Sequence, residues 1–134
     1  MTQAPILFED FQPGALMGEC VEVYDAEQAQ RWQAIFSGSA QPSSSAAEGS
    51  SMAVVGMMRA YLKVVTPRPP GNVHARQKLR MYGVPQLGES IRVSVRCSHK
   101  EMRRERRYVD LQVQGVGEGD RPLFEGLISL IWAA

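Results

Sequence analysis

The stretch that decides the fold is residues 52–65, Met-Ala-Val-Val-Gly-Met-Met-Arg-Ala-Tyr-Leu-Lys-Val-Val. It is apolar almost all the way round a helical wheel, whereas a helix on a protein surface has one apolar and one polar face. Its charges, Arg59 and Lys63, are four residues apart and share one face. The stretch therefore predicts a buried helix, which something wide and apolar, such as a curled sheet, must cover.

Two kinds of residue define the limits and the packing of this helix. Gly56 lies at its middle, where glycine costs about 1 kcal/mol of helix propensity, so we expect a strand or a partner helix to approach closely there. The prolines that begin at Pro67 end the helix, because proline lacks the amide donor and clashes with the preceding turn.

Alternating polar and apolar residues predict the strands of one antiparallel sheet. The segments are residues 19–24, 73–82, 91–97, 109–113 and 123–132. The last is apolar for most of its length and should be central. A second helix is expected over residues 25–36, with Asp25 as its N-cap. The fold class is therefore α+β, with a five- or six-stranded antiparallel sheet wrapped around a long helix.

Length and composition restrict the classes of function. The 134 residues are 44% hydrophobic and 22% charged, which fits one domain spanning 1–134. A net charge of +1 gives no reason to expect nucleic acid or a membrane surface as a partner. No leader sequence is visible, and we expect a cytoplasmic protein. Cys20 and Cys97 lack metal-site spacing and sit in alternating segments, so we expect reduced core thiols and no metal.

Residues 37–51 are rich in serine and glycine and predict a loop that leads directly into the helix. Ser50 or Ser51 is the expected N-cap. A ligand across this loop would face unpaired amides and the positive end of the helix dipole. The alternative is a loop that is merely flexible.

A run of charge at residues 100–107, Lys-Glu-Met-Arg-Arg-Glu-Arg-Arg, predicts a basic hairpin connection. Such a run is usually a solvated tip, and the alternative is a docking patch for phosphates or for an acidic carrier protein. Alternation would place Arg104 and Arg106 on one side, with Arg103 and Arg107 on the other.

Four short motifs carry a resemblance to a known family. They are Phe-Glu-Asp-Phe-Gln-Pro-Gly at 8–14, Tyr-Asp-Ala-Glu at 24–27, Phe-Ser-Gly at 36–38 and Leu-Gly-Glu-Ser at 87–90. With them, the chain resembles the MaoC-like hydratase/dehydratase family, which has a hot-dog fold. The resemblance implies chemistry that adds or removes water across the 2,3 bond of acyl thioesters on CoA or acyl carrier protein.

The chain departs from this family at the residues that carry the chemistry. The family motif Gly-Asp-x-Asn-Pro-hydrophobic-His matches residues 38–44, so the catalytic Asp falls on Ser39 and the catalytic His on Ser44. A serine hydroxyl does not titrate near neutral pH and cannot replace either. The helix amides could still bind an oxyanion, because they do not depend on side chains. The substrate-binding positions that the resemblance implies are Gly38, Pro42, Gly49, Ser50, Ser51 and Met52.

The resemblance and the two substituted catalytic positions leave three possible functions. The first is a MaoC-like protein without the usual catalytic residues, which acts as an acyl-ligand binder or as a supporting subunit beside a catalytic paralogue. The second is a thioesterase that uses Glu48, the one carboxylate in the loop. The third is a structural partner with no small-molecule site. His74 and His99 lie outside the motif loop and are expected to be ordinary strand residues.

The resemblance also suggests ligands and assembly. No cofactor is expected, and the ligand would be a CoA or acyl-carrier thioester whose phosphates meet Arg103, Arg104, Arg106 and Arg107. We expect a homodimer, or a heterodimer with a related chain, because pairing of two sheets side by side buries edge groups.

Overall fold

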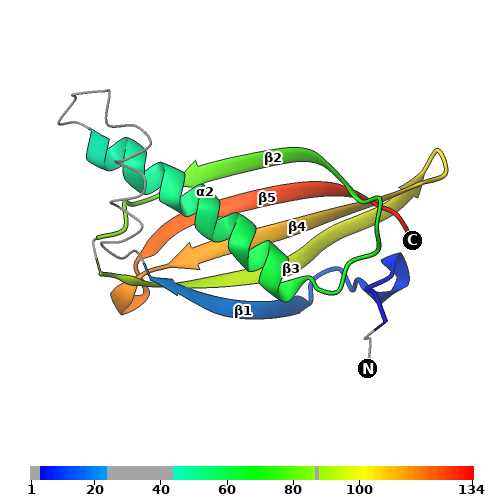
Figure 1. Cartoon of the computed structure of the whole chain (residues 1–134), viewed down its shortest axis with the longest axis horizontal. Helices are drawn as coiled ribbons and strands as arrows, with labels where there is room; N and C mark the ends of the chain where they lie inside the picture. The colour runs from blue at the N-terminus through cyan, green and yellow to red at the C-terminus, as the bar shows by residue number, and fades with distance from the viewer. Residues whose placement is uncertain (1–3, 24–43, 87) are drawn as a thin grey trace.

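The computed structural model describes residues 4–23, 44–86 and 88–134, and for residues 44–53 it describes the backbone. These residues form one antiparallel sheet and one long helix, so the predicted α+β class is confirmed (Figure 1). The strands are β1 (Leu16–Val23), β2 (Val73–Met81), β3 (Ser90–Arg103), β4 (Arg106–Val116) and β5 (Pro122–Trp132). The helix is α2 (Ser44–Val64), and short 3-10 turns lie at Phe8–Asp10 and Glu118–Asp120.

The sheet has the strand order β1-β3-β4-β5-β2, with every neighbouring pair antiparallel. All five predicted strand segments are present. β5 lies inside the sheet, as its apolar sequence predicts, although the middle strand is β4. The helix expected over residues 25–36 lies outside the described residues.

The serine-rich segment before residue 52 is where the sequence prediction is wrong. α2 begins at Ser44, so residues 44–51 are helical rather than a loop, and neither Ser50 nor Ser51 is its N-cap. Serine costs only a few tenths of a kcal/mol in a helix, and Ala46, Ala47 and Glu48 favour it. Residues 44–51 therefore add more than two turns to the start of the predicted helix, although their composition is typical of a loop.

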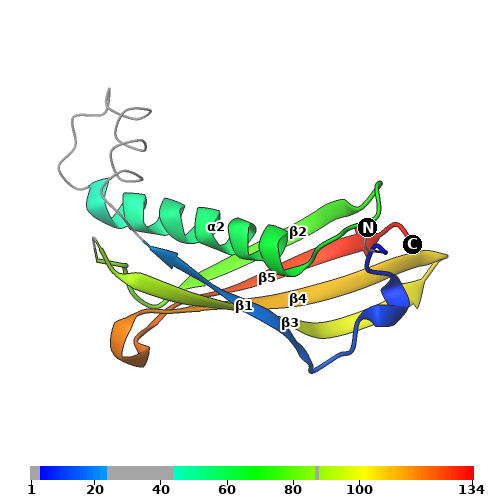
Figure 2. The same ribbon diagram turned by 60° about the horizontal axis from the view of Figure 1, so that its bottom comes forward.

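The helix is buried on one face, not all round. Met57, Ala60 and Val65 have no exposed surface, whereas Val55 and Leu62 are 39% and 48% exposed. α2 packs on β1, β3 and β4 from one side of the sheet (Figure 2). The helix is therefore less completely buried than its sequence predicts, because the sheet packs on one side of it.

The close approach expected at the helix glycine occurs on the sheet instead. Among the described residues, no atom beyond the helix's own nearby backbone lies within 4 Å of a Cβ built at Gly56. On β5, a Cβ built at Gly126 would lie 2.2 Å from Met57 Sδ. The missing side chain that lets helix and sheet meet is therefore that of Gly126.

The core lies between α2 and the inner face of the sheet, where β3, β4 and β5 supply the buried side chains. At one end, Phe11 and Trp132 pack edge to face with ring centroids 4.9 Å apart. The Trp132 indole N–H donates to the Ile6 carbonyl at 2.7 Å, so the N-terminal segment closes that end of the core. Among the described residues, no helix is long and apolar enough to cross a membrane.

The basic hairpin is tighter than the sequence predicts. β3 and β4 continue to Arg103 and from Arg106, so the connection is two residues, Arg104 and Glu105. Both have positive φ, 52° and 63°, the backbone that a two-residue hairpin turn requires. The arginines therefore belong mostly to strands rather than to a loop.

Candidate functional site

The structure places the predicted site residues in two groups. Gly38, Ser39 and Pro42 lie outside the described residues. The others, Ser44, Glu48, Gly49, Ser50, Ser51 and Met52, all lie in the N-terminal half of α2. This group shares one helix, and its members do not form the loop that the sequence predicts.

The start of α2 is where free backbone donors lie. Amides in the first turn of a helix have no acceptor within the helix, and the dipole adds positive charge there. With α2 beginning at Ser44, these include the amides of residues 44–46. The amides of Ser50 and Ser51 belong to the helix interior, so the free donors lie at Ser44.

The charged face of α2 holds the helix to strand β1. Lys63 Nζ lies 2.7 Å from one carboxylate oxygen of Glu22, and Arg59 Nη1 lies 3.7 Å from the other. The hydrogen bond and the charge of Glu22 raise the pKa of Lys63. The prediction that Arg59 and Lys63 share a face is confirmed, since both pair with Glu22 of β1.

Neither cysteine has the character of a nucleophile. Burial raises the pKa of the Cys20 thiol, and the nearby Glu22 carboxylate raises it further. Burial also raises the pKa of Cys97, which has no exposed surface. Both are free thiols, so they stay protonated near neutral pH, as expected for core cysteines.

Glu89 is a buried carboxylate that the sequence did not single out, although it belongs to the motif at 87–90. It accepts hydrogen bonds from the backbone amides of Gln86 and Glu118, at 2.8 and 2.9 Å, and pairs with Arg121. Burial alone would raise its pKa, but these donors outweigh burial and lower the pKa. A Cβ built at Gly117 would lie 2.1 Å from its carboxylate. Glu89 therefore clamps the β2–β3 connection to the β4–β5 turn, which is a structural task.

The register of the hairpin corrects the predicted arginine pairs. Arg103 pairs with Arg106 across the hairpin, and Arg107 pairs with Met102. Paired residues share a face of the sheet, so Arg103 and Arg106 lie on one side and Arg107 on the other. The prediction that Arg103 and Arg107 share a side is wrong, because Arg104 lies in the turn.

The hairpin also lies far from the start of α2. β3 runs from the end of the sheet near the helix N-terminus to the hairpin (Figure 1). Its 14 residues span about 46 Å at about 3.3 Å each. His74 at the start of β2 and His99 in the second half of β3 belong to this distant end as well. Within one chain, these residues and the helix amides form no common site.

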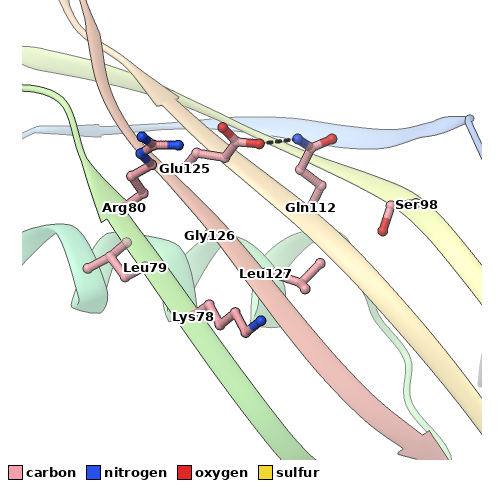
Figure 3. A pocket seen from close by; sticks show the side chains of 8 residues that line it. All are labelled: Lys78, Leu79, Arg80, Ser98, Gln112, Glu125, Gly126 and Leu127. Carbon is pink, nitrogen blue, oxygen red and sulfur yellow. Dashed lines mark hydrogen bonds between the residues drawn. The ribbon is translucent and has the colours of Figure 1, made fainter.

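The outer face of the sheet, away from α2, carries a hollow of about 510 Å³ that the sequence did not predict (Figure 3). Glu125 lies in it and accepts hydrogen bonds from Gln112 Nε2 and, at 3.0 Å, from the Tyr82 hydroxyl. Lys78 and Arg80 of β2 also line this hollow. The strand alternation could have identified these outward positions, but not the hollow. Its lining residues are Lys78, Leu79, Arg80, Ser98, Gln112, Glu125, Gly126 and Leu127.

No family model and no curated protein matches this sequence. Solved structures do match in fold. A MaoC-like dehydratase from Rhodospirillum rubrum has a TM-score of 0.74 and 13% identity, with 96% of this chain and 98% of that chain covered. This chain has the hot-dog fold.

Two further hot-dog structures are similar over most of the chain. The (R)-hydratase PhaJ1 from Pseudomonas aeruginosa has a TM-score of 0.69 and 18% identity, with coverage of 93% of this chain and 84% of that one. A chain of the ChsH1-ChsH2 complex from Mycobacterium tuberculosis has a TM-score of 0.64 and 13% identity, covering 91% and 98%. The hot-dog prediction is thus confirmed, and the sequences are far too different for function to follow from the fold.

Proposed function

We propose that this hot-dog protein binds an acyl thioester, carried on CoA or acyl carrier protein, at the N-terminal end of α2, without performing the hydratase reaction. Its role is that of an acyl-ligand binder or of a supporting subunit beside a catalytic paralogue. The observation that supports this most is that α2 begins at Ser44, so unpaired amides coincide with the motif position that lacks its histidine. Backbone amides still polarise a thioester carbonyl when no general acid or base is present.

One substitution separates the amide from the side chain. Ser44→Pro removes the amide of the first helical residue, where proline is accepted without loss of the helix, and Ser44→Ala keeps it. We expect Ser44→Pro to weaken crotonyl-CoA binding about fivefold, the value of one hydrogen bond, in isothermal titration calorimetry. Ser44→Ala should bind as the parent does. Absence of crotonyl-CoA binding to the parent protein would contradict the proposal.

A second measurement tests the absence of hydratase chemistry. We expect the purified protein to leave crotonyl-CoA unhydrated, because Ser39 and Ser44 cannot move protons near neutral pH. Hydration that Ser39→Ala or Ser44→Ala abolished would show that the substituted motif is catalytic after all.

The alternative within the enzyme class is a thioesterase that uses Glu48. Position 48 is one helical turn after position 44, so this carboxylate belongs to the same end of α2 as the free amides. Release of free CoA from a panel of acyl-CoAs, compared with Glu48→Gln, decides between binding and hydrolysis. Release that Glu48→Gln abolishes would favour the thioesterase.

The ligand site is proposed to need two chains. Val55 and Leu62 leave an apolar flank of α2 exposed, and β2 is a free edge of the sheet. A two-fold axis through paired β2 edges reverses the strand direction, so the hairpin of one chain comes to the end of the assembly where α2 of the other begins. The hairpin arginines would thus serve the phosphates of a ligand bound to the partner. A dimer, homomeric or with a related chain, is part of the proposal. A monomeric mass by light scattering would contradict its homomeric form.

A further inference from the structure

Strand β2 is the edge of the sheet, and its outer face is a row of cations. In the β2–β5 register, Arg76, Lys78 and Arg80 pair with Ser129, Leu127 and Glu125. The intervening residue Leu79 pairs with Gly126, which meets α2, so Leu79 belongs to the inner face and the three cations to the outer one. Among the described residues, no strand pairs with the other side of β2, so this edge presents its backbone groups and three positive charges together.

These charges have no close ion pair among the described residues of their own sheet, although Glu125 lines the hollow beside Lys78 and Arg80, and Glu101 and Asp110 line the hollow beside Arg76. Ser129 and Leu127 carry no charge opposite Arg76 and Lys78. Glu125, opposite Arg80, already accepts hydrogen bonds from Gln112 and Tyr82, and the Arg80 guanidinium lies 5.7 Å from the centre of the Tyr82 ring. Within the described part of the chain, no salt bridge of 4.0 Å or less to any of the three is found.

Two hollows lie beside this row on the same outer face. Lys78 and Arg80 line the hollow of about 510 Å³ (Figure 3). Arg76 lines a second one of about 290 Å³. The cationic side chains thus have open space next to them rather than packed neighbours. An incoming side chain with a carboxylate could enter this space.

The row has a direct consequence for pairing between two copies of this chain. Antiparallel pairing of β2 with itself about a two-fold axis keeps outer face beside outer face in any register. The three cations of each chain would then lie in one patch across the interface between the two β2 strands. Like charges directly opposite each other on paired strands are destabilising, and opposite charges are stabilising by a similar amount.

We propose that β2 pairs with the edge strand of a different, related chain that carries carboxylates on its outer face, and that self-pairing is the weaker association. This rests on the proposed function, since it selects the supporting-subunit form of it and names the chemistry of the partner. The charge row then acts as the device that chooses the heteromeric assembly over the homomeric one.

A charge-reversed copy of this chain is a defined acidic probe. The variant Arg76→Glu/Lys78→Glu/Arg80→Glu presents an acidic edge with the same backbone, and circular dichroism checks that it folds. Lys78→Glu is the milder second variant. Wild type and variant are mixed in equal amounts, native mass spectrometry counts the mixed and self dimers, and sedimentation gives their dissociation constants at about 20 mM and about 500 mM salt.

The expected result is a mixed dimer at least about tenfold tighter than either self dimer at low salt. Salt should weaken the mixed dimer and strengthen wild-type self-association, because it screens attraction in one and repulsion in the other. Lys78→Glu should show the same direction with a smaller preference. The matched control, Arg103→Glu/Arg104→Glu/Arg106→Glu, makes the same change of charge at the hairpin and should show no preference for mixing.

Three outcomes would overturn the proposal. They are a wild-type dimer as tight as the mixed one, an equal preference from the hairpin control, and no mixed dimer at all, as for an edge whose charges only prevent aggregation. Crotonyl-CoA binding is measured separately on each sample. A protein that binds the thioester but shows no mixed dimer refutes this inference alone, and one that binds no thioester refutes the proposed function.

Discussion

The inner and outer faces of the same sheet differ in how much freedom they leave a side chain. Inside, Val93, Val113 and Ile128 have no exposed surface, and two glycines, at 115 and 126, leave no room for a methyl group. Outside, charged side chains of both signs and polar side chains border two hollows. Changes on the inner face should therefore act on stability, and changes on the outer face on association.

The largest effect should come from Gly115. A Cβ built there would lie 2.1 Å from Phe124 Cε1, and a rigid ring that is only 3% exposed cannot move aside easily. Gly115→Ala should lower the free energy of unfolding by about 3 kcal/mol in urea titrations. Gly119→Ala is a poor control because Gly119 has a positive φ, so the comparison is Gly56→Ala. An unchanged urea midpoint for Gly115→Ala would contradict the expectation that changes on the inner face act on stability.

Glu89 should give the next effect, since it is buried at the rim between the two faces. Glu89→Gln places an amide N–H₂ among the donors of Gln86, Glu118 and Arg121, and should cost about 2 kcal/mol at pH 7. Glu118→Gln, which leaves the backbone amide in place, should change stability by less than about 0.5 kcal/mol.

The Glu89 effect should also depend on pH in a defined direction. The folded protein lowers the pKa of Glu89, so the carboxylate contributes its full stability above the pKa of the unfolded chain. That contribution is lost as pH falls through the folded pKa. The difference between wild type and Glu89→Gln should therefore shrink on acidification, and a difference that grew would contradict the clamp.

A smaller effect of opposite sign is expected at Gly56. In the described part of the chain, an added methyl group would meet no atom within 4 Å beyond the helix's own nearby backbone. Alanine is also better than glycine in a helix interior by about 1 kcal/mol. Gly56→Ala should raise the unfolding midpoint of the chain at concentrations where it is monomeric. A loss of dimer with a gain in monomer stability would indicate that a partner packs on Gly56.

The smallest effect on stability should come from the outer face itself. Arg76→Ala and Lys78→Ala should each change the free energy of unfolding by less than about 0.5 kcal/mol, because both residues are exposed and oppose uncharged residues on β5. A decrease in the free energy of unfolding of more than about 1.5 kcal/mol in urea titrations would mean that these cations stabilise the sheet itself rather than its association with a partner.

Local chemistry explains which sequence predictions succeeded. Strand alternation places Val93, Val95 and Cys97 inside and Arg92 and Arg96 outside, because side chains alternate across any strand. The predicted end of α2 before Pro67 is also correct for a local reason. Proline lacks an amide donor and clashes with the preceding turn of a helix. The predicted start of α2 was wrong because the serines and glycine of residues 44–51 suggested a loop, although Ala46, Ala47 and Glu48 favour a helix.

The sequence by itself determined the α+β class, the apolar inner face of the sheet and the serines at the two motif positions, Ser39 and Ser44. These are properties of residue identity and of period along the chain. Tertiary structure decided that α2 begins at Ser44, that Glu89 is a clamp, and that Arg76, Lys78 and Arg80 line an edge beside two hollows. Such features depend on which strands become neighbours in the sheet. Strand order brings together residues that are far apart in the sequence, and the alternation of residues along one strand does not predict these contacts.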